Sequence, residues 1–470
     1  MSKLDMDAIC QYASESFDAT VEQLCRYLKT PAISCDSDHF QDVRDLAEEI
    51  RQDLESLGFQ NAQVCCLDNA LPLVTAEMKA AEEGKPTVLI YGHFDLQPVK
   101  DEPWDTPPHE AAQKGERLYA RGSADDMGGW VSHMAALKAW LKIHGSIPVN
   151  IKLVIEGEEE IGSPNLERYM DTYPELFQSD VMVLTDCENP SVDIPGLTVS
   201  LRGLYEVELI CSALDADVHS GLWGNMAPDV STALFKTLSR IIDDDGRLSI
   251  GQVDVPAAWR EKSKAIPLTN EVIQLGAHIQ KGVSPLPPRE RTPAEWIWRQ
   301  PALTILSTTL PTPGKEKNAL RTKASAVLSI RLAPGQTRED MRSLLHEALL
   351  SSPVGGVAID LVERPAHAES WLYEPQGEAF VAADRAYKKS WGHGLLEVGV
   401  GGSIPFVALF GRKFGNLPLI LNGVMDPETG AHGPNESMHL GVFKKAIMAN
   451  IHLLHELAES GEQILHERNA

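Results

Sequence analysis

The run of acidic residues at positions 156–160 is the feature of this sequence that most constrains the fold. It places four carboxylates within five positions, directly after the apolar run at 149–155. Neighbouring carboxylates repel one another, and close burial of two of them raises the pKa of one unless a strong positive charge lies between them. Taken alone, such a run is most often a solvated acidic turn, and a metal site is the alternative. The rest of the chain favours the metal site.

Length and composition bound the class of protein. A chain of 470 residues is too long for one ordinary core, so we expect at least two domains. The formal net charge of -25 argues against a nucleic-acid or anionic-membrane partner, because Lys and Arg bind phosphates. The amino-terminal residues lack a secretory pattern and no apolar run is long enough to span a membrane, so we expect a cytoplasmic protein. The 7 cysteines are scattered without Cys-x-x-Cys spacing, which argues against a disulfide framework or a thiolate zinc site.

Short apolar runs that end in polar residues recur along the first part of the chain. Residues 86–91 precede Gly-His-Phe-Asp, residues 149–155 precede the acidic run, and residues 181–185 precede Asp186. Between them, residues 130–143 carry apolar side chains at helical spacing. Strands that alternate with helices form a mostly parallel sheet flanked by helices, and ligands bind beyond the carboxyl ends of its strands. The sequence therefore predicts an α/β fold with its polar groups gathered at one edge of the sheet.

The pattern changes near residue 203. Strands are predicted at 204–210, 302–308 and 324–331, and helices at 227–242 and 337–350. Residues 243–300 are rich in proline and charge, and their structure is left open. Helix and strand patterns resume near residue 371 and end in a helix over 440–458. We expect a discontinuous catalytic domain, residues 1–202 and 368–470, interrupted by an inserted α+β lid or dimerisation domain, residues 203–367.

Metal-binding side chains follow three of the predicted strands. His93, the pair Glu159 and Glu160, and Asp186 all stand at strand ends. Asp125 precedes a predicted helix, and His432 lies in a late loop. Histidines and carboxylates without cysteine are typical of a pair of zinc-like ions bridged by one carboxylate.

These motifs occur in the order found in the co-catalytic zinc peptidase family that contains carboxypeptidase G, the aminoacylases, succinyl-diaminopimelate desuccinylase and the carnosinase-type dipeptidases. The chain resembles that family from about residue 85 to 440. The resemblance implies two divalent ions per subunit, zinc first and manganese or cobalt as alternatives, that activate a water for attack on an amide bond. The metal ligands that it implies are His93, Asp125, Glu160, Asp186 and His432. It makes Glu159 the general base and Asp95 the carboxylate that orients the site.

The resemblance also assigns residues of the inserted domain. His219 is similar to a histidine that reaches the partner subunit's active site and stabilises the oxyanion, which implies a homodimer through this domain. Arg331 resembles the arginine that holds the substrate's free carboxylate, a task suited to the planar guanidinium. Asn318, Gly402 and Ser403 stand at positions that help to hold the substrate.

Two departures from the family pattern are visible. Met127 follows the Asp-Asp pair where relatives usually have lysine, so we expect altered contacts around the ligands without loss of metal. Asn318 is followed by Ala-Leu-Arg, through Arg321, where relatives have an apolar pair ending in proline. The shape of this loop, and with it the substrate preference, stays open.

We interpret the chain as a metallopeptidase that cleaves dipeptides or similar small amides with a free carboxylate. The motif from Trp296 to Pro301 before a strand is closer to the carnosinase-type branch than to the short-lid deacylases. An N-acyl amino acid deacylase or carbamoyl amidohydrolase of the same fold is the alternative. A non-catalytic binding protein is a third interpretation, which the complete ligand set disfavours. Neither the dipeptide nor the native metal follows from the sequence.

Overall fold

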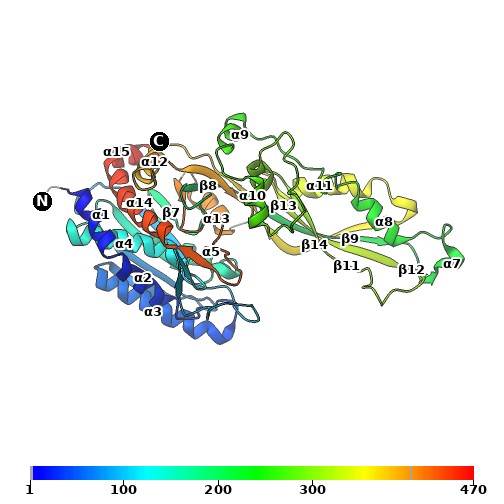
Figure 1. Ribbon diagram of the computed structural model, residues 1–470, viewed down its shortest axis with the longest axis horizontal. Helices are drawn as coiled ribbons and strands as arrows, with labels where there is room; N and C mark the ends of the chain where they lie inside the picture. The colour runs from blue at the N-terminus through cyan, green and yellow to red at the C-terminus, as the bar shows by residue number, and fades with distance from the viewer. Residues whose placement is uncertain (1–3, 403–404, 416, 470) are drawn as a thin grey trace. The chain divides into compact units, whose positions relative to one another are not determined.

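The computed structural model describes residues 4–402, 405–415 and 417–469, and the chain forms two compact units (Figure 1). The first unit comprises Met1–Val199, Glu374–Val398 and Leu409–Ala470. The second comprises Ser200–Tyr373 and Gly399–Ala408. The role of residues 203–367 as an inserted lid or dimerisation domain stays a prediction.

A six-stranded sheet forms the centre of the first unit. Its strands lie in the order β1 (Gln60–Cys65), β2 (Leu73–Met78), β6 (Asn150–Glu156), β3 (Thr87–His93), β7 (Val181–Leu184) and β17 (Leu419–Leu421). The pairs β6–β3, β3–β7 and β7–β17 are parallel, whereas β1–β2 and β2–β6 are antiparallel. The expected mostly parallel sheet is confirmed, and the antiparallel edge strands β1 and β2 are additional to the prediction.

Helices cover both faces of this sheet. Neighbouring residues of β3 point to opposite faces: the ring of Tyr91 lies 5.2 Å from that of Phe410 in α13, whereas Gly92 abuts Trp130 of α4. The helices of this unit are α1 (Met6–Glu15), α2 (Phe17–Tyr27), α3 (Phe40–Leu57), α4 (Met127–Ile143), α5 (Leu166–Thr172), α6 (Pro174–Phe177), α12 (Glu378–Trp391), α13 (Pro405–Phe414), α14 (Leu440–Glu459) and α15 (Gly461–Asn469). Ser16 separates α1 from α2, and its Oγ donates to the carbonyl of Tyr12.

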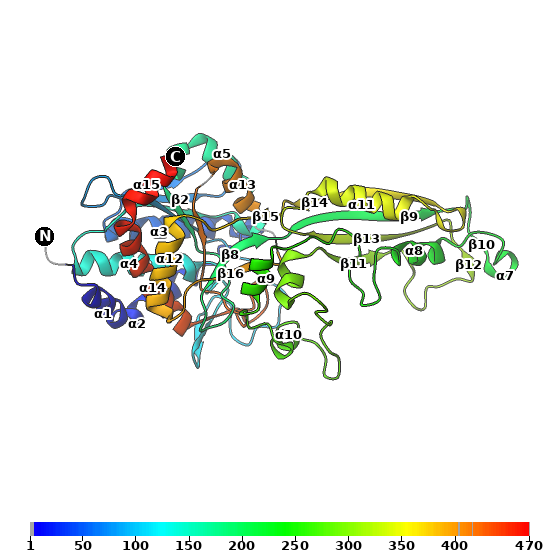
Figure 2. The same cartoon turned by 90° about the horizontal axis from the view of Figure 1, so that it is seen from above.

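The second unit is built on a four-stranded antiparallel sheet. The strands lie in the order β11 (Ala302–Thr308), β13 (Lys323–Leu332), β9 (Gly203–Ser212) and β14 (Ala358–Ala368). Helix α8 (Val230–Leu238) contacts β13 and β9, and α11 (Arg338–Leu350) contacts β14 (Figure 2). Alternate residues of β9 are buried, so one face of the sheet and these two helices share a core. The strand β14 is absent from the sequence-based prediction.

Short elements complete the two units. The region 243–300 contains α9 (Ala257–Ser263), α10 (Asn270–Gly276) and a π-helical turn, η3 (Glu295–Arg299). A two-residue ladder joins β10 (Val218–His219) to β12 (Ala319–Leu320), and α7 (Ser220–Trp223) follows β10. The small sheets are β18 (Ser437–His439), β5 (Arg117–Tyr119) and β4 (Ala112–Lys114), and β15 (Trp371–Leu372), β8 (Gly196–Leu201) and β16 (Leu396–Val400). The 3₁₀ turns are η1 (Ser37–His39), η2 (Glu159–Ile161) and η4 (Val354–Gly356). Within the described ranges, no helix combines the length and the apolar character that crossing a bilayer requires.

The central sheet yields a stability prediction. Leu153 of β6 is 1% exposed and lies between Ala76 of β2 and Ile90 of β3. Leu153→Ala should lower the free energy of unfolding by about 2–5 kcal/mol, because it removes apolar burial and leaves a cavity. Urea unfolding followed by circular dichroism measures this loss. Val381→Ala on α12, where the side chain is 49% exposed, is the control and should change the free energy of unfolding by less than about 0.5 kcal/mol. Equal midpoints for the two variants would contradict the packing described for β6.

Candidate metal centre

Five side chains of the first unit form two overlapping clusters. Ligand atoms of His93, Asp125 and Asp186 all lie within 4.8 Å of one another, as do those of Asp125, Glu160 and His432. Asp125 belongs to both clusters and offers a different oxygen to each. Its Oδ1 lies 3.2 Å from Nε2 of His93, and its Oδ2 lies 3.1 Å from Nε2 of His432. The geometry is that of two adjacent sites that share one carboxylate.

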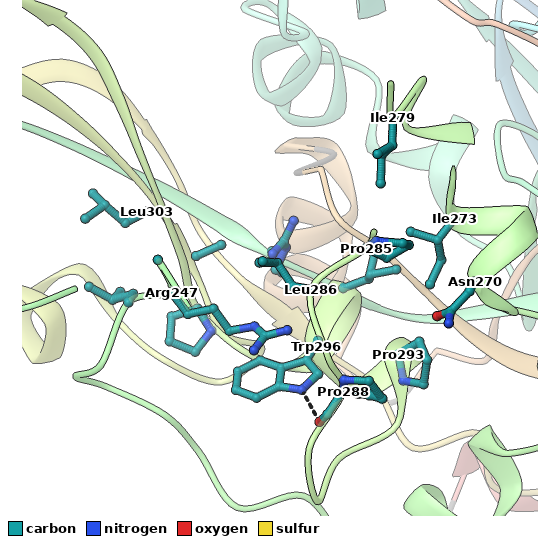
Figure 3. A pocket seen from close by; sticks show the side chains of 16 residues that line it. Arg247, Asn270, Ile273, Ile279, Pro285, Leu286, Pro288, Pro293, Trp296 and Leu303 are labelled. Atoms are coloured by element: carbon teal, nitrogen blue, oxygen red, sulfur yellow. Dashed lines mark hydrogen bonds between the residues drawn. The ribbon is translucent and has the colours of Figure 1, made fainter. Parts of the chain in front are cut away.

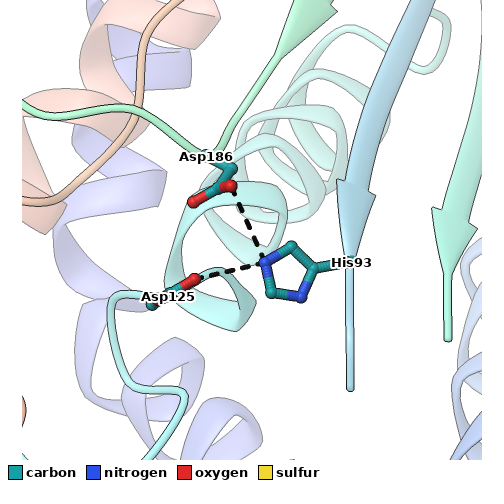
Figure 4. Close-up of side chains that lie close together, drawn as sticks. All are labelled: His93, Asp125 and Asp186. Atoms are coloured by element: carbon teal, nitrogen blue, oxygen red, sulfur yellow. Dashed lines mark hydrogen bonds and ion pairs between the residues drawn. The ribbon is translucent and has the colours of Figure 1, made fainter. Parts of the chain in front are cut away.

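The sheet explains why these residues meet. His93 ends β3, Glu160 lies in the turn after β6, and Asp186 follows β7. Because these three strands are parallel neighbours, their carboxyl ends lie at one edge. Figure 4 shows His93 at the end of its strand, with Asp125 and Asp186 directed towards the same ring nitrogen. The distances from Nε2 of His93 are 3.2 Å to Asp125 and 3.8 Å to Asp186.

Asp95 connects the first ligand motif to the acidic run. Its Oδ1 accepts the backbone N–H of Glu159 at 3.1 Å, and its Oδ2 accepts that of Glu160 at 3.0 Å. The same carboxylate lies 3.5 Å from Nδ1 of His93, and both side chains are fully buried. Asp95 therefore holds the 159–160 backbone and the imidazole ring in fixed relation to each other.

Two further acidic residues support the ligands, and neither has a role in the sequence-based prediction. Both carboxylate oxygens of Glu436, which is fully buried, accept hydrogen bonds. Its Oε1 accepts the backbone N–H groups of Ala124 and Asp125 at 3.2 Å each. Its Oε2 accepts Nη1 of Arg121 at 2.9 Å and the backbone N–H of Gly122 at 3.1 Å. Glu436 thus fixes the backbone that carries Asp125, and its position four residues after His432 was the available signal.

Asp126 performs a similar task on the other side of the shared ligand. Its Oδ2 accepts the hydroxyl of Thr185 at 2.6 Å and the backbone N–H of His93 at 3.2 Å. The next residue, Met127, is fully buried as the first residue of α4. Met127 therefore contributes apolar packing where a lysine would bring a charge.

The electrostatics of the centre follow from its burial. Burial raises the pKa of Glu159 well above its usual range. The positive charge of His93 opposes this shift, and the negative charges of the nearby acids add to it. Burial and Asp125 raise the pKa of Asp186 to about 7. Hydrogen bonds that His432 donates to Asp125 and Glu160 raise the pKa of His432 to about 11. The negative charges of the clustered carboxylates therefore exceed the positive charge available from the two imidazoles, and the carboxylates repel one another. A divalent cation relieves this repulsion.

The donor set fits such cations. Imidazole nitrogens and carboxylate oxygens, without a thiolate, suit divalent ions of the zinc type and also accept manganese or cobalt. The side chain of Glu160 is 3% exposed and that of His432 is 59% exposed. One cluster therefore has an accessible side.

The remaining predicted site residues belong to the second unit. His219 is exposed and accepts the backbone N–H of Gly221 through Nδ1 at 3.1 Å. Asn318 is also exposed. It lies beside His219, since its backbone carbonyl accepts the N–H of Ser220 at 3.0 Å. Both residues thus lie at the β10–β12 ladder, away from the sheet that carries Arg331.

Arg331 and Gly402 lie elsewhere in that unit. Arg331 is half-buried on β13, opposite Ala302 of β11 and Leu204 of β9. Gly402 is half-buried in the segment after β16. Ser403 lies outside the described residues.

Comparisons with known proteins place these features in context. The profile of peptidase family M20/M25/M40 matches residues 89–459 of the chain. A cysteinylglycine-S-conjugate dipeptidase of Corynebacterium striatum is 29% identical over 404 residues, which cover 85% of this chain and 87% of that protein. A Beta-Ala-His dipeptidase of Rattus norvegicus is 28% identical over 389 residues, which cover 78% and 76%. The solved structure of the dipeptidase Dug1p from Saccharomyces cerevisiae superposes with a TM-score of 0.76 at 24% identity, covering 97% of this chain and 99% of that one.

Glu436 provides a test of how the shared ligand is held. In Glu436→Gln, either orientation of the amide sets an NH₂ group against N–H donors, so the backbone of Asp125 should shift. We expect the affinity for zinc to fall about 10- to 100-fold, the usual effect of losing a group that orients a ligand. Competition with a fluorescent chelator measures the affinity.

The matched control for this experiment is Glu428→Gln. Glu428 precedes His432 in the same loop and its side chain is 70% exposed, so this variant should bind zinc like the wild type. If Glu436→Gln also binds zinc like the wild type, Glu436 does not position Asp125.

Proposed function

We propose that this chain, which belongs to peptidase family M20/M25/M40, hydrolyses dipeptides that carry a free C-terminal carboxylate. The observation that carries the proposal is the carboxylate of Asp125, which offers one oxygen to each of two adjacent clusters. The names of the two relatives, a cysteinylglycine-conjugate and a Beta-Ala-His dipeptidase, support dipeptides as the substrate class.

In this proposal, each cluster holds one divalent ion. His93, Asp125 and Asp186 would hold one ion, and Asp125, Glu160 and His432 the other. We infer zinc, with manganese or cobalt as alternatives. When bound, such ions supply Lewis acidity that acidifies a water molecule and polarises the substrate carbonyl.

Glu159 moves the proton in this scheme. Its side chain is 13% exposed, and its Oε2 lies 4.0 Å from Nε2 of His93. As the water oxygen bonds to the carbonyl carbon, Glu159 takes the water proton and then delivers it to the leaving amine nitrogen as the C–N bond breaks. Because Asp95 fixes the backbone of Glu159, the carboxylate is oriented before substrate arrives.

The second unit supplies substrate recognition in this proposal. Arg331 binds the C-terminal carboxylate with its planar guanidinium, and Asn318, Gly402 and Ser403 help to hold the substrate. His219, which is exposed, stabilises the oxyanion in the active site of a partner subunit. A monomer would then be incomplete.

Exposed apolar side chains of the second unit support the homodimer. Phe235 of α8 is 58% exposed, and Ile305 and Leu306 of β11 are 41% and 54% exposed. Strand β11 is also an edge of its sheet, with backbone groups that a second chain can pair. We propose this edge as the contact between two copies.

All seven cysteines are free, which supports a reducing, cytoplasmic location.

Substrate panels test the proposed reaction. With added zinc, manganese or cobalt, the protein should hydrolyse dipeptides and lose this activity with a chelator.

Glu159→Gln should lower kcat by about 10²–10⁴-fold, because the variant cannot carry the proton. Glu167→Gln, which changes an exposed glutamate of α5, is the control. Hydrolysis of N-acyl amino acids alone would identify a deacylase instead, and wild-type rates in Glu159→Gln would remove the base from this scheme.

The homodimer has its own test. The double variant Phe235→Asp with Leu306→Asp should be monomeric in light scattering and should lose dipeptidase activity, because His219 no longer meets a partner's site. Val362→Asp places the same charge on the opposite edge strand β14, where the side chain is 48% exposed, and should stay dimeric. A dimeric, active double variant would place the interface elsewhere.

A further inference from the structure

The second unit contains a cavity of about 410 Å³ that the proposed reaction does not use (Figure 3). It lies among Arg202, the turn at 246–248, helix α10, the loop at 285–293, the turn η3 and the start of β11. Pockets for small ligands in proteins have volumes of about 300–1,000 Å³, so this cavity is large enough for an aromatic or branched side chain.

The walls of the cavity are mainly apolar. Ile273 of α10, Leu286 of the loop and Leu303 of β11 line it together with several prolines and the indole of Trp296. Figure 3 shows Trp296 beside Arg247 and Pro288. Its Nε1 donates to the carbonyl of Pro288 at 2.7 Å, and the guanidinium of Arg247 lies 4.5 Å from its ring centre. A fixed aromatic wall of this kind favours an apolar occupant.

The charged groups behind this wall are already paired. Arg247 donates to Asp245 at 3.0 Å and to the carbonyl of Pro287 at 2.8 Å. Arg291, also close to the indole, pairs with the fully buried Glu295 at 2.6 Å. These arginines therefore hold the wall in place and need no counter-ion from a ligand.

Arg202, unlike Arg247 and Arg291, has no acidic partner among the described residues. Its Nε donates to the carbonyl of Gly401 at 3.1 Å, and no carboxylate pairs with it within the described residues. Burial, together with the nearby positive charge of Arg331, lowers the pKa of Arg202 to about 10. Two neighbouring guanidinium groups without an acid leave a positive site that a ligand's carboxylate would neutralise.

The cavity adjoins the proposed carboxylate anchor. Ala302, which lines the cavity, lies directly opposite Arg331 in the β11–β13 ladder, and Arg202 belongs to both the cavity wall and the arginine pair. We propose that the cavity receives the side chain of the substrate's C-terminal residue and favours large apolar side chains, while Arg202 and Arg331 share its carboxylate. This inference rests on the proposed dipeptidase function, and it names the position of the dipeptide that determines specificity.

The substrates Ala-Gly, Ala-Leu and Ala-Phe test it directly. Each apolar group that enters a fitting pocket contributes about tenfold or more to discrimination, so kcat/KM for Ala-Leu and Ala-Phe should exceed that for Ala-Gly by at least about tenfold. Ile273→Trp fills the cavity and should abolish this preference. Leu275→Trp adds the same indole to the same helix at a position that is 69% exposed and outside the cavity, and should keep the preference. Leu286→Trp, in the loop, is a second filling variant.

The role of Arg202 requires a substrate without the carboxylate. Arg202→Gln should raise KM for all three dipeptides by about tenfold or more, with kcat less affected, because a charge-assisted hydrogen bond is lost. Wild-type enzyme should bind the C-terminal amide of Ala-Phe weakly, and Arg202→Gln should weaken it no further. An equal loss on the acid and the amide would assign Arg202 a structural role and overturn its part in the proposal.

The outcomes separate this inference from the proposed function. Hydrolysis of all three dipeptides at equal efficiency, or a preference that survives both filling variants, overturns the cavity's role and leaves the dipeptidase function intact. If no dipeptide is hydrolysed, calorimetry with N-acetylphenylalanine and N-acetylglycine still decides. Tighter binding of the aromatic acid, lost in Ile273→Trp and kept in Leu275→Trp, supports the cavity, and equal binding overturns it.

Discussion

The repulsion among buried carboxylates at one edge of the central sheet is the constraint on which the first unit depends. Parallel strands bring their ends together, so Glu160 and Asp186 meet Asp125 there whether or not their charges are compatible. Two imidazoles do not neutralise them, and burial together with the charge of Asp125 raises the pKa of Asp186 to about 7. A divalent cation relieves this repulsion, and Asp125 offers one oxygen to each of the two clusters.

The geometry of the centre is held by three acidic residues that lie outside the two ligand clusters. Asp95, Asp126 and Glu436 each accept backbone N–H groups next to a ligand, so the ligands are fixed through the main chain as well as through their rings. A carboxylate that accepts a backbone N–H group fixes the position of that part of the main chain, and it brings no side-chain donor that could compete for the ligand oxygens. The substrate recognition that we propose for the second unit uses different groups, two guanidinium groups and an apolar wall.

The sequence predicts the parts of the fold that depend on local pattern. Apolar runs identified β3, β6 and β7, and the polar residues after them are the candidate ligands that the structure brings together, because the strand ends of a parallel sheet meet at one edge. It missed β14, whose residues are mostly exposed and lack a clear alternation. It also missed Glu436 and Asp126, whose roles depend on hydrogen bonds to backbone groups. The backbone N–H of Asp125, which donates to Glu436, lies 311 positions away from it in the sequence. The cavity depends on loops in region 243–300, for which composition predicts no shape.

The long-range bonds of Glu436 also bear on how the protein is made. The loop with His432 and Glu436 leaves the ribosome after the entire second unit, and β17 joins β7 only then. Domains generally fold as they are synthesised, from the amino terminus onward. Until β17 and His432 are synthesised, the nascent sheet therefore has an open edge beside β7, and the acidic cluster lacks one of its two imidazoles. The centre is therefore complete only after the whole second unit has been synthesised.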